Sequence, residues 1–368
     1  MTGNPNSGET VAVYASDGKF LAWGAYSPKS QIICRIWTWD ESDVIDSEFL
    51  RRKLQIAINF RKAYISNGVT NSYRCVFSES DGIPGLIIDR YDSCLVLQIT
   101  SAGAEFWRNS LIGICREVPG VTVCYERSES EIRKLEGLPP SQGLIFGTKL
   151  NSPLEIHEWG IRYLVDIENG QKTGFFLDQR ENRKMVQEFS NNARVLNCFS
   201  YTGGFSLNAF KGGATEIITI DSSADAIGLA VKNWELNSFP NDRGIWIEGD
   251  VFQELRKFRD RDEKFDLIIL DPPKFAPNTR SVPAAARAYK DINLLAFKLL
   301  RNGGILFTFS CSGGIEADLF QKIIQGAALD AKREVQILEK LRQDIDHPVP
   351  LNYPEAEYLK GLICRVII

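Results

Sequence analysis

The residues best suited to chemistry in this sequence follow short apolar runs, and the most distinctive of them is a lone cysteine. In "FTFSCSGG", Cys311 ends an apolar run, lies between two serines and precedes Gly313 and Gly314. A free cysteine is most often a small buried apolar residue. At the end of a strand and near the start of a helix, however, the helix dipole lowers the pKa of a thiol and favours a nucleophile. The following "IEADLFQKII" predicts such a helix.

Carboxylates follow the neighbouring apolar runs. Asp221 ends "EIITID", and Asp250 follows "GIWIEG". A carboxylate at the first position can accept hydrogen bonds from both hydroxyls of a ribose, and one at the second can accept from an adenine amino group. Either aspartate alone is equally well explained as a helix cap. Together with Gly203 and Gly204 of "NCFSYTGGFSL", where the backbone can approach a ligand closely, they favour an adenosyl ligand.

Missing motifs narrow the choice of ligand. The sequence has neither GxGxxG nor GxxxxGK[ST], which disfavours NAD, FAD and ATP. It has two histidines and no CxxC pair, so we predict no metal site. Acid–base chemistry is then left to carboxylates, lysines or water. Asp271 in "LDPPKFA" is a candidate, because Pro272 and Pro273 restrict its turn and present it rigidly.

A parallel sheet would bring these residues together. The runs "RVLNCF", "EIITID", "GIWIEG", "DLIILD" and "GILFTFS" are separated by segments of helix length, which predicts parallel strands with crossover helices. Ligands of such sheets bind at the carboxyl ends of the strands, so Cys311 and Asp271 are expected on one rim. Phe307 and Phe309 should face the core, and Ser310 and Ser312 should border the site. The last runs, "REVQILE" and "LKGLICRVII", predict an antiparallel pair.

The first half of the chain follows other patterns. Residues 8–39 alternate apolar and polar residues around Asp17-Gly18 and Ser27-Pro28, which predicts short strands of a small β module. "DSEFLRRKLQIAINFRKAYI" predicts an amphipathic helix. We interpret its basic face as solvated, with RNA contact as the alternative; this face comprises Arg51, Arg52, Lys53, Arg61 and Lys62. The stretch 70–165 predicts a second small α/β domain, in which "YRCVFSESDGIPGLIIDRYDSCLVLQIT" forms three strands and 104–117 a helix.

Composition sets broad limits. The chain has 368 residues, of which 44% are hydrophobic and 24% charged, as expected for a globular protein of two or three domains. No apolar run approaches the roughly 18 residues of a membrane helix, and the polar start resembles no targeting peptide, so we expect a cytoplasmic protein without membrane partners. The first 74 residues carry nine Lys and Arg against seven Asp and Glu within a net charge of −4, which permits RNA binding without requiring it.

The motifs resemble a known family. "NCFSYTGGFS", "IDSS", "GDVF", "DPPKFA" and "TFSCSGG", in this order, are similar to class I S-adenosylmethionine-dependent methyltransferases. "NGQKTGFFLDQRENR" upstream and "YKDINLLAFKLL", "DHPV" and "YLKGLICRV" downstream extend the similarity to RlmI-type 23S ribosomal RNA cytosine-5 methyltransferases, from about residue 8 to the C-terminus. The resemblance implies an α/β fold: a class I (Rossmann-like) methyltransferase domain with a mostly parallel seven-stranded sheet, a central α+β domain and a partial N-terminal PUA-like β module.

The resemblance also implies domain bounds, a cofactor and site residues. The expected domains are a partial PUA-like RNA-binding module (1–48), a linking helix (49–69), the central α+β domain (70–165) and the methyltransferase domain (166–368). The implied cofactor is S-adenosylmethionine, and the implied partners are 23S rRNA and, in a homodimer, a second copy of the chain. Cys311 and Asp271 would be catalytic. The residues expected to bind the cofactor are Phe176, Asp178, Gln179, Arg180, Asn197, Phe199, Gly203, Asp221, Ser222, Asp250, Val251 and Asp271.

The implied reaction gives Cys311 a definite role. Cytosine C5 is too weak a nucleophile to take a methyl group unaided, so a thiolate first adds to C6. A carboxylic acid at Asp271 with a raised pKa can assist through N3 and the exocyclic amine. Many RNA cytosine-5 methyltransferases carry a second cysteine where this sequence has Pro273-Lys274. The group that accepts the C5 proton is therefore left open.

Several alternatives remain at this stage. Cys198 is the rival thiol, although it falls within the cofactor-loop motif and is expected to pack beneath it. Methylation of an amino group uses [NDS]PP[YFW], where Lys274 takes the aromatic position and Phe275 comes one place late. Methylation of guanine N7 would leave Cys311 without a role. A small-molecule methyltransferase and a non-catalytic RNA-binding ribosome-assembly factor are further alternatives, and a pure binder has no physical reason to keep the cofactor residues.

Overall fold

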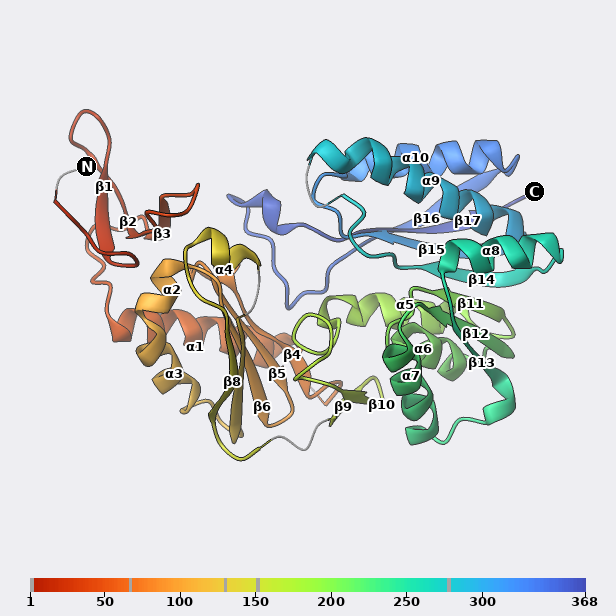
Figure 1. Cartoon of the computed structure of the whole chain (residues 1–368), viewed down its shortest axis with the longest axis horizontal. Coiled ribbons are helices and arrows are strands. Elements are labelled where there is room, and N and C mark those ends of the chain that lie inside the picture. Colours follow the sequence, from red (N-terminus) through yellow and green to blue (C-terminus); the bar gives the residue numbers. More distant parts are fainter. Residues whose placement is uncertain (1–2, 66–67, 129–130, 150–152, 277–278) are drawn as a thin grey trace. The chain divides into compact units, whose positions relative to one another are not determined.

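The structure is a computed structural model that describes residues 3–65, 68–128, 131–149, 153–276 and 279–368 (Figure 1). Its contacts divide the chain into two units. Unit 1 comprises Met1–Gly160, Val165–Leu177 and Ile345–Ala356, and unit 2 comprises Ile161–Leu164, Asp178–Asp344 and Glu357–Ile368. Each unit therefore combines segments that are distant in the sequence. The four domain bounds expected from the resemblance stay predictions, and residues 66 and 67 of the expected linking helix lie outside the described residues.

Unit 2 is built on a seven-stranded sheet with the order β13-β12-β11-β14-β15-β17-β16. The neighbours from β13 to β15 pair in parallel, whereas β17 runs antiparallel to both β15 and β16. The mostly parallel sheet with a final antiparallel pair is thus confirmed. The strands are β11 (Arg194–Cys198), β12 (Glu216–Asp221), β13 (Gly244–Glu248), β14 (Phe265–Leu270), β15 (Leu300–Ser310), β16 (Val335–Arg342) and β17 (Lys360–Val366).

Helices cover both faces of this sheet (Figure 1). Side chains alternate along a strand, so Ile268 and Leu270 of β14 pack against the first set of helices, and Leu267 and Ile269 against the second. Burial on both faces explains why the strands read as continuous apolar runs. The first set is α8 (Val251–Asp260), α9 (Val282–Leu299) and α10 (Ala317–Asp330), and the second is α5 (Arg180–Phe189), α6 (Gly204–Lys211) and α7 (Ala224–Leu236).

Unit 1 contains two sheets. An antiparallel sheet joins β1 (Thr10–Tyr14), β2 (Phe20–Tyr26) and β3 (Cys34–Thr38). The second has the order β4-β5-β6-β7-β8, in which the pairing of β6 with β7 alone is parallel. Its strands are β4 (Ser72–Phe77), β5 (Leu86–Tyr91), β6 (Cys94–Ile99), β7 (Val123–Ser128) and β8 (Ser141–Phe146), and its helices are α1 (Ser47–Tyr64), α2 (Ala102–Phe106), α3 (Arg108–Cys115) and α4 (Glu131–Leu135). The strands β9 (Leu154–Glu158) and β10 (Ile161–Val165) follow in the chain.

Two predicted helices have different bounds in the structure. The helix expected over 104–117 is two helices, because the chain leaves helical geometry at Trp107, with φ −91° and ψ 9°. The helix expected directly after "FTFSCSGG" begins only at Ala317. Before it, the N–H of Ile315 donates to the carbonyl of Ser312 at 3.1 Å, and Glu316 is extended. These residues form a turn, so the hydrophobic spacing of "IEADLF" placed the helix start too early.

A segment near the C-terminus belongs to unit 1 through buried polar contacts. The carboxylate of Asp346 accepts a hydrogen bond from the backbone N–H of Arg74 at 3.0 Å and contacts Nδ1 of His347 at 2.7 Å. The Arg61 guanidinium donates to the Asp346 carbonyl at 2.9 Å and to the Asp81 carboxylate at 2.7 Å. Arg61, Asp346 and His347 are all buried. Buried hydrogen bonds of this kind specify one docking position for Ile345–Ala356.

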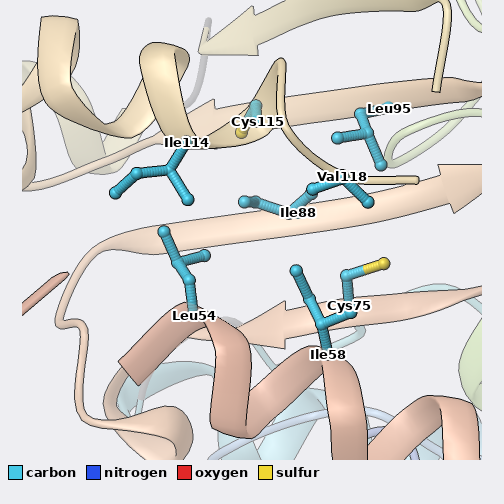
Figure 2. A pocket seen from close by; sticks show the side chains of 8 residues that line it. All are labelled: Leu54, Ile58, Cys75, Ile88, Leu95, Ile114, Cys115 and Val118. Carbon is cyan, nitrogen blue, oxygen red and sulfur yellow. The ribbon is translucent and has the colours of Figure 1, made fainter. Parts of the chain in front are cut away.

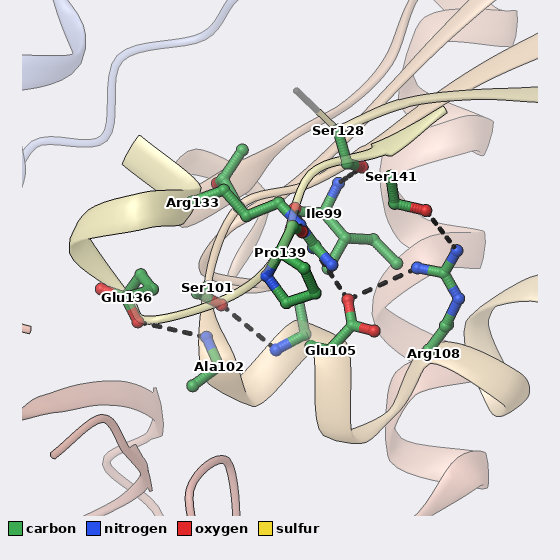
Figure 3. A network of polar contacts seen from close by, with 12 residues as sticks. Ile99, Ser101, Ala102, Glu105, Arg108, Ser128, Arg133, Glu136, Pro139 and Ser141 are labelled. Carbon is green, nitrogen blue, oxygen red and sulfur yellow. Dashed lines mark hydrogen bonds and ion pairs between the residues drawn. The ribbon is translucent and has the colours of Figure 1, made fainter. Parts of the chain in front are cut away.

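A second buried guanidinium ties together elements of the central sheet (Figure 3). Arg133 of α4 donates to the carbonyl of Ile99 at 2.8 Å, to the carboxylate of Glu105 at 2.8 Å and to the carbonyl of Pro139. Glu136, also buried, accepts from the N–H of Ala102 at 3.1 Å. Removing one partner of such a network leaves a buried charge unpaired, which is strongly destabilising. This network therefore holds α4 against β6 and α2.

The core of unit 1 contains one small apolar cavity among the described residues (Figure 2). Its volume is about 10 Å³, and aliphatic and cysteine side chains line it: Leu54, Ile58, Cys75, Ile88, Leu95, Ile114, Cys115 and Val118. A space of this size without polar partners stays dry and holds no ligand. The cavity is therefore a packing gap between α1, α3 and the sheet.

Leu54→Ala and Ile56→Ala separate the core of unit 1 from its surface. Leu54 is 1% exposed and borders the cavity, whereas Ile56 on the same helix is 62% exposed. We expect Leu54→Ala to lower the free energy of unfolding by about 2–5 kcal/mol, because the existing gap enlarges. Ile56→Ala should change it by less than about 0.5 kcal/mol. Chemical denaturation followed by circular dichroism measures both, and equal losses would contradict the assigned core.

Candidate functional site

The two predicted catalytic residues follow neighbouring strands. Asp271 comes directly after Leu270, the last residue of β14, and Cys311 directly after Ser310, the last residue of β15. The strands are parallel, and Leu270 is the register partner of Thr308. The carboxyl ends of both strands therefore lie at the same edge of the sheet, where ligands of open α/β sheets bind.

Asp271 and Cys311 also lie on the same face of the sheet. Cys311 is half-buried and packs against the hydrophobic cluster that contains Phe309 and residues of α5 and α6. Two positions before Asp271, Ile269 belongs to the same cluster. The carboxylate of Asp271 accepts a hydrogen bond from Nε2 of Gln179, directly before α5, at 3.0 Å. The structure thus brings together the thiol and the carboxylate that the sequence predicted on one rim.

A buried tyrosine holds the loop that carries Cys311. The hydroxyl of Tyr289 on α9 accepts from Oγ of Ser310 at 2.9 Å and shares a hydrogen bond with Oγ of Ser312 at 3.0 Å. Oγ of Ser312 also accepts from the backbone N–H of Ala276, in the turn after β14, at 3.1 Å. Both serines are completely buried. They therefore anchor the loop to the core, and the prediction that they border the site is wrong. Phe307 and Phe309 are buried in the core, as predicted.

The environment of Tyr289 keeps its hydroxyl neutral. Burial raises the pKa of the Tyr289 phenol, and the hydrogen bonds with Ser310 and Ser312 offset part of this effect. Negative charge on Cys311 and on Asp271 raises it further. A neutral phenol can donate one hydrogen bond and accept others at any physiological pH. Tyr289 is therefore a permanent structural link between the two strand ends.

The other seven cysteines are poor nucleophiles. Burial raises the pKa of the thiol at each of them, most of all in the core, and the thiolate is the reactive form. Cys198 is completely buried in β11, and burial raises the pKa of its thiol strongly. This confirms that the rival thiol packs beneath the loop. The remaining six are Cys34, Cys75, Cys94, Cys115, Cys124 and Cys364.

The loop after β11 has an unusual backbone. Phe199, Tyr201 and Gly203 have φ of 58°, 48° and 80°, so three of five successive residues are left-handed. For residues other than glycine this conformation costs of order 1 kcal/mol or more, and it is frequent where a backbone contacts a ligand. A Cβ on Gly203 would lie 3.0 Å from Cβ of Ala230, so a side chain there would be both strained and crowded. Gly203 thus opens α6, as predicted.

Asp221 and Asp250 end the strands next to this loop. The carboxylate of Asp221 accepts from the N–H of Tyr201 at 2.8 Å and from the N–H of Ser223 at 3.0 Å. Asp250 is exposed and caps α8 by accepting from the N–H of Gln253 at 2.9 Å. The capping interpretation therefore holds for Asp250, whereas Ser223 caps α7 and Asp221 instead holds the loop after β11. Carboxylates at the ends of β12 and β13, beside a left-handed loop at the end of β11, also fit the ribose and base of an adenosyl group.

Other residues expected to bind the cofactor lie in different surroundings. Asn197 is buried in β11 and donates to Oγ of Ser206 at 2.8 Å. Val251 is the first residue of α8 and is buried in the core, so only the backbone of these two residues could reach a ligand. Ser222 is exposed beside Asp221. Phe176 belongs to unit 1, where Nζ of Lys172 lies 4.6 Å from the centroid of its ring.

The residues around the start of α5 are buried and paired within unit 2. Asp178 accepts from the hydroxyl of Tyr358 at 2.5 Å, and Arg180 forms an ion pair with Asp344. The backbone N–H of Asp344 donates to the carbonyl of Asp178 at 3.0 Å. Gln179 accepts from the side-chain amide of Asn182 at 2.6 Å while donating to Asp271. Their cofactor role stays a prediction, and these contacts fix Gln179 where it can orient the Asp271 carboxylate.

Sequence reasoning missed two residues at the rim. Tyr289 lies inside an amphipathic helix, and a tyrosine on the apolar face of such a helix is normally interpreted as a residue of the hydrophobic core. Lys360 is the first residue of β17 and donates from Nζ to the carbonyl of Ser312 at 3.1 Å. Its register partner in β15 is Ser310, directly before Cys311. No local signal could have found Lys360, because its position depends on how two strands that are distant in the sequence align.

Comparison with known proteins agrees with this site. A family profile described as S-adenosylmethionine-dependent methyltransferase matches residues 142–364, and a PUA-like domain profile matches residues 1–39. Ribosomal RNA large subunit methyltransferase I of Shigella dysenteriae is 48% identical over 100% of this chain and 92% of its own length. The protein of the same name from Aeromonas salmonicida is 50% identical over 99% of this chain and 92% of its own length.

The chain belongs to the family of S-adenosylmethionine-dependent methyltransferases. This methyltransferase shares its fold with a solved methyltransferase complexed with SAH, at a TM-score of 0.87 and 23% identity, over 98% of this chain and 92% of that one. The predicted α/β class I fold, PUA-like N-terminus and S-adenosylmethionine cofactor are confirmed. Within the described residues of the methyltransferase, no helix is long and apolar enough to cross a membrane.

We predict that Asp221→Ala weakens cofactor binding by the methyltransferase by about tenfold or more, because the ribose loses a charged acceptor. Asp225→Ala is the matched control, since Asp225 is an exposed aspartate in the first turn of α7, which follows the same strand. The affinity of Asp225→Ala for S-adenosylmethionine should stay within about twofold of the wild-type affinity. Isothermal titration calorimetry with S-adenosylmethionine measures both. Equal affinities for wild type and Asp221→Ala would remove Asp221 from the cofactor site.

Proposed function

We propose that this methyltransferase forms 5-methylcytosine in the RNA of the large ribosomal subunit, with Cys311 as nucleophile. The substrate class is supported by relatives named ribosomal RNA large subunit methyltransferase I, which are similar over essentially the whole chain. The observation that carries the chemical proposal is the placement of the half-buried Cys311 and of Asp271 after neighbouring parallel strands, on one face and one rim of the sheet. Cytosine C5 needs such a pair, because it reacts only after a nucleophile has added to C6.

The proposed reaction begins and ends with the thiolate. Cys311 adds its electron pair to C6 of the flipped cytosine, forms the C6–S bond and makes C5 nucleophilic. Asp271, in its protonated form, can donate to N3 and accept from the exocyclic amine. Bound S-adenosylmethionine supplies the methyl group that C5 receives. The C5 proton then leaves to a base, the C5–C6 double bond re-forms, and the C6–S bond breaks to return the thiolate of Cys311.

The surroundings of Asp271 suit this role. The hydrogen bond from Gln179 at 3.0 Å holds one carboxylate oxygen, and Pro272 and Pro273 restrict the turn that follows. A group held in one orientation loses little freedom when the base binds, and much of the advantage of an active site comes from this restriction. Gln179 is itself held by Asn182. Asp271 is thus a suitable positioned partner for a planar base.

The turn after β14 disfavours methylation of an amino group. That chemistry needs an aromatic ring in the turn to stack on the flipped base, and Phe275 is the available ring. Its centroid lies 4.9 Å from that of Tyr289 and 6.1 Å from that of Phe252, and the ring packs against the core. The preceding residue, Lys274, is exposed and not aromatic. Methylation of guanine N7 would leave the placement of Cys311 beside Asp271 without a purpose.

RNA contact is better assigned to β1–β3 than to α1. Two exposed arginines of α1 have acidic partners: Arg51 pairs with Glu117, and Arg52 with Asp43 at 2.7 Å. Arg61, which the helical pattern placed on the exposed face, is completely buried. The interpretation of this face as an ordinary solvated surface therefore suits the structure better than an RNA interface. RNA binding by the PUA-like module and a homodimer stay predictions.

Cys311→Ala tests the proposed nucleophile. We expect methyl transfer to fall at least about a thousandfold, because no other group can add to C6, while S-adenosylmethionine binding stays near normal. Cys34→Ala is the matched control, since Cys34 is the other half-buried cysteine and lies in β3. The assay is transfer of labelled methyl groups to large-subunit RNA. Methylation by Cys311→Ala at the wild-type rate would contradict covalent catalysis through this thiol.

The identity of the product is tested separately. RNA methylated by the wild-type protein is digested to nucleosides and analysed by mass spectrometry. We expect 5-methylcytidine, because Cys311 has a chemical role only in C5 methylation. Recovery of 7-methylguanosine or of an N-methylated nucleoside instead would contradict the proposed reaction while leaving the methyltransferase assignment intact.

A further inference from the structure

Lys360 reaches the Cys311 loop from a neighbouring strand. In the antiparallel pairing of β15 with β17, Ser310 is the partner of Lys360 and Phe309 is the partner of Gly361. A Cβ on Gly361 would lie 2.6 Å from Cδ1 of Phe309, so the glycine allows the start of β17 to lie close against β15. Nζ of the half-buried Lys360 then donates to the carbonyl of Ser312 at 3.1 Å. The lysine therefore contacts the residues on both sides of Cys311.

The pKa of Lys360 is lowered overall, and neighbouring acidic groups limit this decrease. Burial lowers the pKa of Lys360, and the positive charge of Lys274 lowers it further. Negative charge on Cys311 raises it, as do the carboxylates of Glu357 and Glu316. The opposing acidic groups thus stabilise the protonated form against partial burial. By reciprocity, the same interaction stabilises negative charge on Cys311.

Neither Tyr289 nor Asp271 supplies a positive charge to Cys311. Tyr289 on α9 is neutral and interacts with negative charge on both Cys311 and Asp271. A carboxylate at Asp271 opposes a second negative charge on the same rim. The helix dipole expected to activate the thiol is remote in sequence, because α10 begins at Ala317, six residues after Cys311. Stabilisation of a thiolate therefore needs a cation. Lys360 is half-buried and bonded to the Ser312 carbonyl, whereas Lys274 is exposed, so Lys360 is the better placed to supply it.

We propose that the ammonium of Lys360 holds Cys311 in its thiolate form and positions it for attack. This inference rests on the proposed function for the role of Cys311 as nucleophile. Lys360 acts through the thiol and through the Ser312 carbonyl, so it is a positioning residue. An adjacent ammonium favours the charged form of a thiol and lowers its pKa.

Three variants separate the charge of Lys360 from its hydrogen bond. Lys360→Arg keeps both the positive charge and a donor for the Ser312 carbonyl. Lys360→Gln keeps a donor but has no charge. Lys340→Gln is the matched control, because Lys340 is an exposed lysine on β16 of the same sheet and loses the same charge. Thermal melts of all three establish that the fold is retained.

The decisive readout is the pH dependence of alkylation of Cys311. The free protein is treated with iodoacetamide over a range of pH, and mass spectrometry of the Cys311 peptide gives the apparent pKa of this thiol. In Lys360→Gln we expect this pKa to rise by about one unit or more, because the thiolate loses its counter-charge. Lys360→Arg should stay close to the wild type, and Lys340→Gln should not change. In a plot of the methyl-transfer rate against pH, the rise of the rate from low pH should shift to higher pH together with the thiol pKa.

An alkylation curve of folded Lys360→Gln that overlays the wild-type curve would overturn the proposal. If Lys360→Gln does not fold, Lys360→Met, which keeps the length of the side chain without its charge, replaces it. The same rise of the thiol pKa is expected, and an unchanged pKa in folded Lys360→Met would refute the role of Lys360. Because alkylation uses no RNA, its result does not depend on which base is methylated. Failure of the proposed function would appear instead as a different methylated nucleoside.

Discussion

The hydrogen bonds of one buried phenol determine where the reactive thiol can lie. Tyr289 binds the hydroxyls of Ser310 and Ser312, and Ser312 in turn binds the backbone of Ala276 in the turn after β14. The loop that carries Cys311 is therefore joined to the turn that begins with Asp271, through atoms that no solvent reaches. Such fully satisfied buried networks make a local structure unique, because any other arrangement would leave a polar group unpaired.

Other elements of unit 2 position the groups on either side of this link. Strands β14 and β15 form the rim, and Gln179, directly before α5, holds the Asp271 carboxylate. The C-terminal strand β17 pairs with β15 and brings Lys360 to the Ser312 carbonyl. The loop with left-handed residues after β11, which we predict to hold the adenosyl group, follows a strand of the same sheet. The predicted cofactor site and Cys311 thus share one edge of one sheet, while the helices on its faces exclude water from the strands.

Local patterns in the sequence predicted much of this arrangement. Apolar runs followed by Asp221, Asp271 and Cys311 identified strand ends correctly, because burial on both faces and alternation along a strand are local properties. The burial of Ser312, the role of Tyr289 and the approach of Lys360 could not be predicted, because they depend on contacts between distant segments. The start of α10 was also placed too early, since hydrophobic spacing does not record the turn that the Ser312 carbonyl closes with Ile315.

A covalent complex with 5-fluorocytosine RNA tests the central claim most directly. Fluorine at C5 cannot leave as a proton does, so an enzyme that adds a thiolate to C6 and methylates C5 remains attached to the RNA. The account predicts a stable RNA–protein adduct that requires S-adenosylmethionine and that mass spectrometry locates on the peptide containing Cys311. Methylation of the corresponding natural RNA without any adduct on the fluorinated RNA, or an adduct on another cysteine, would contradict it.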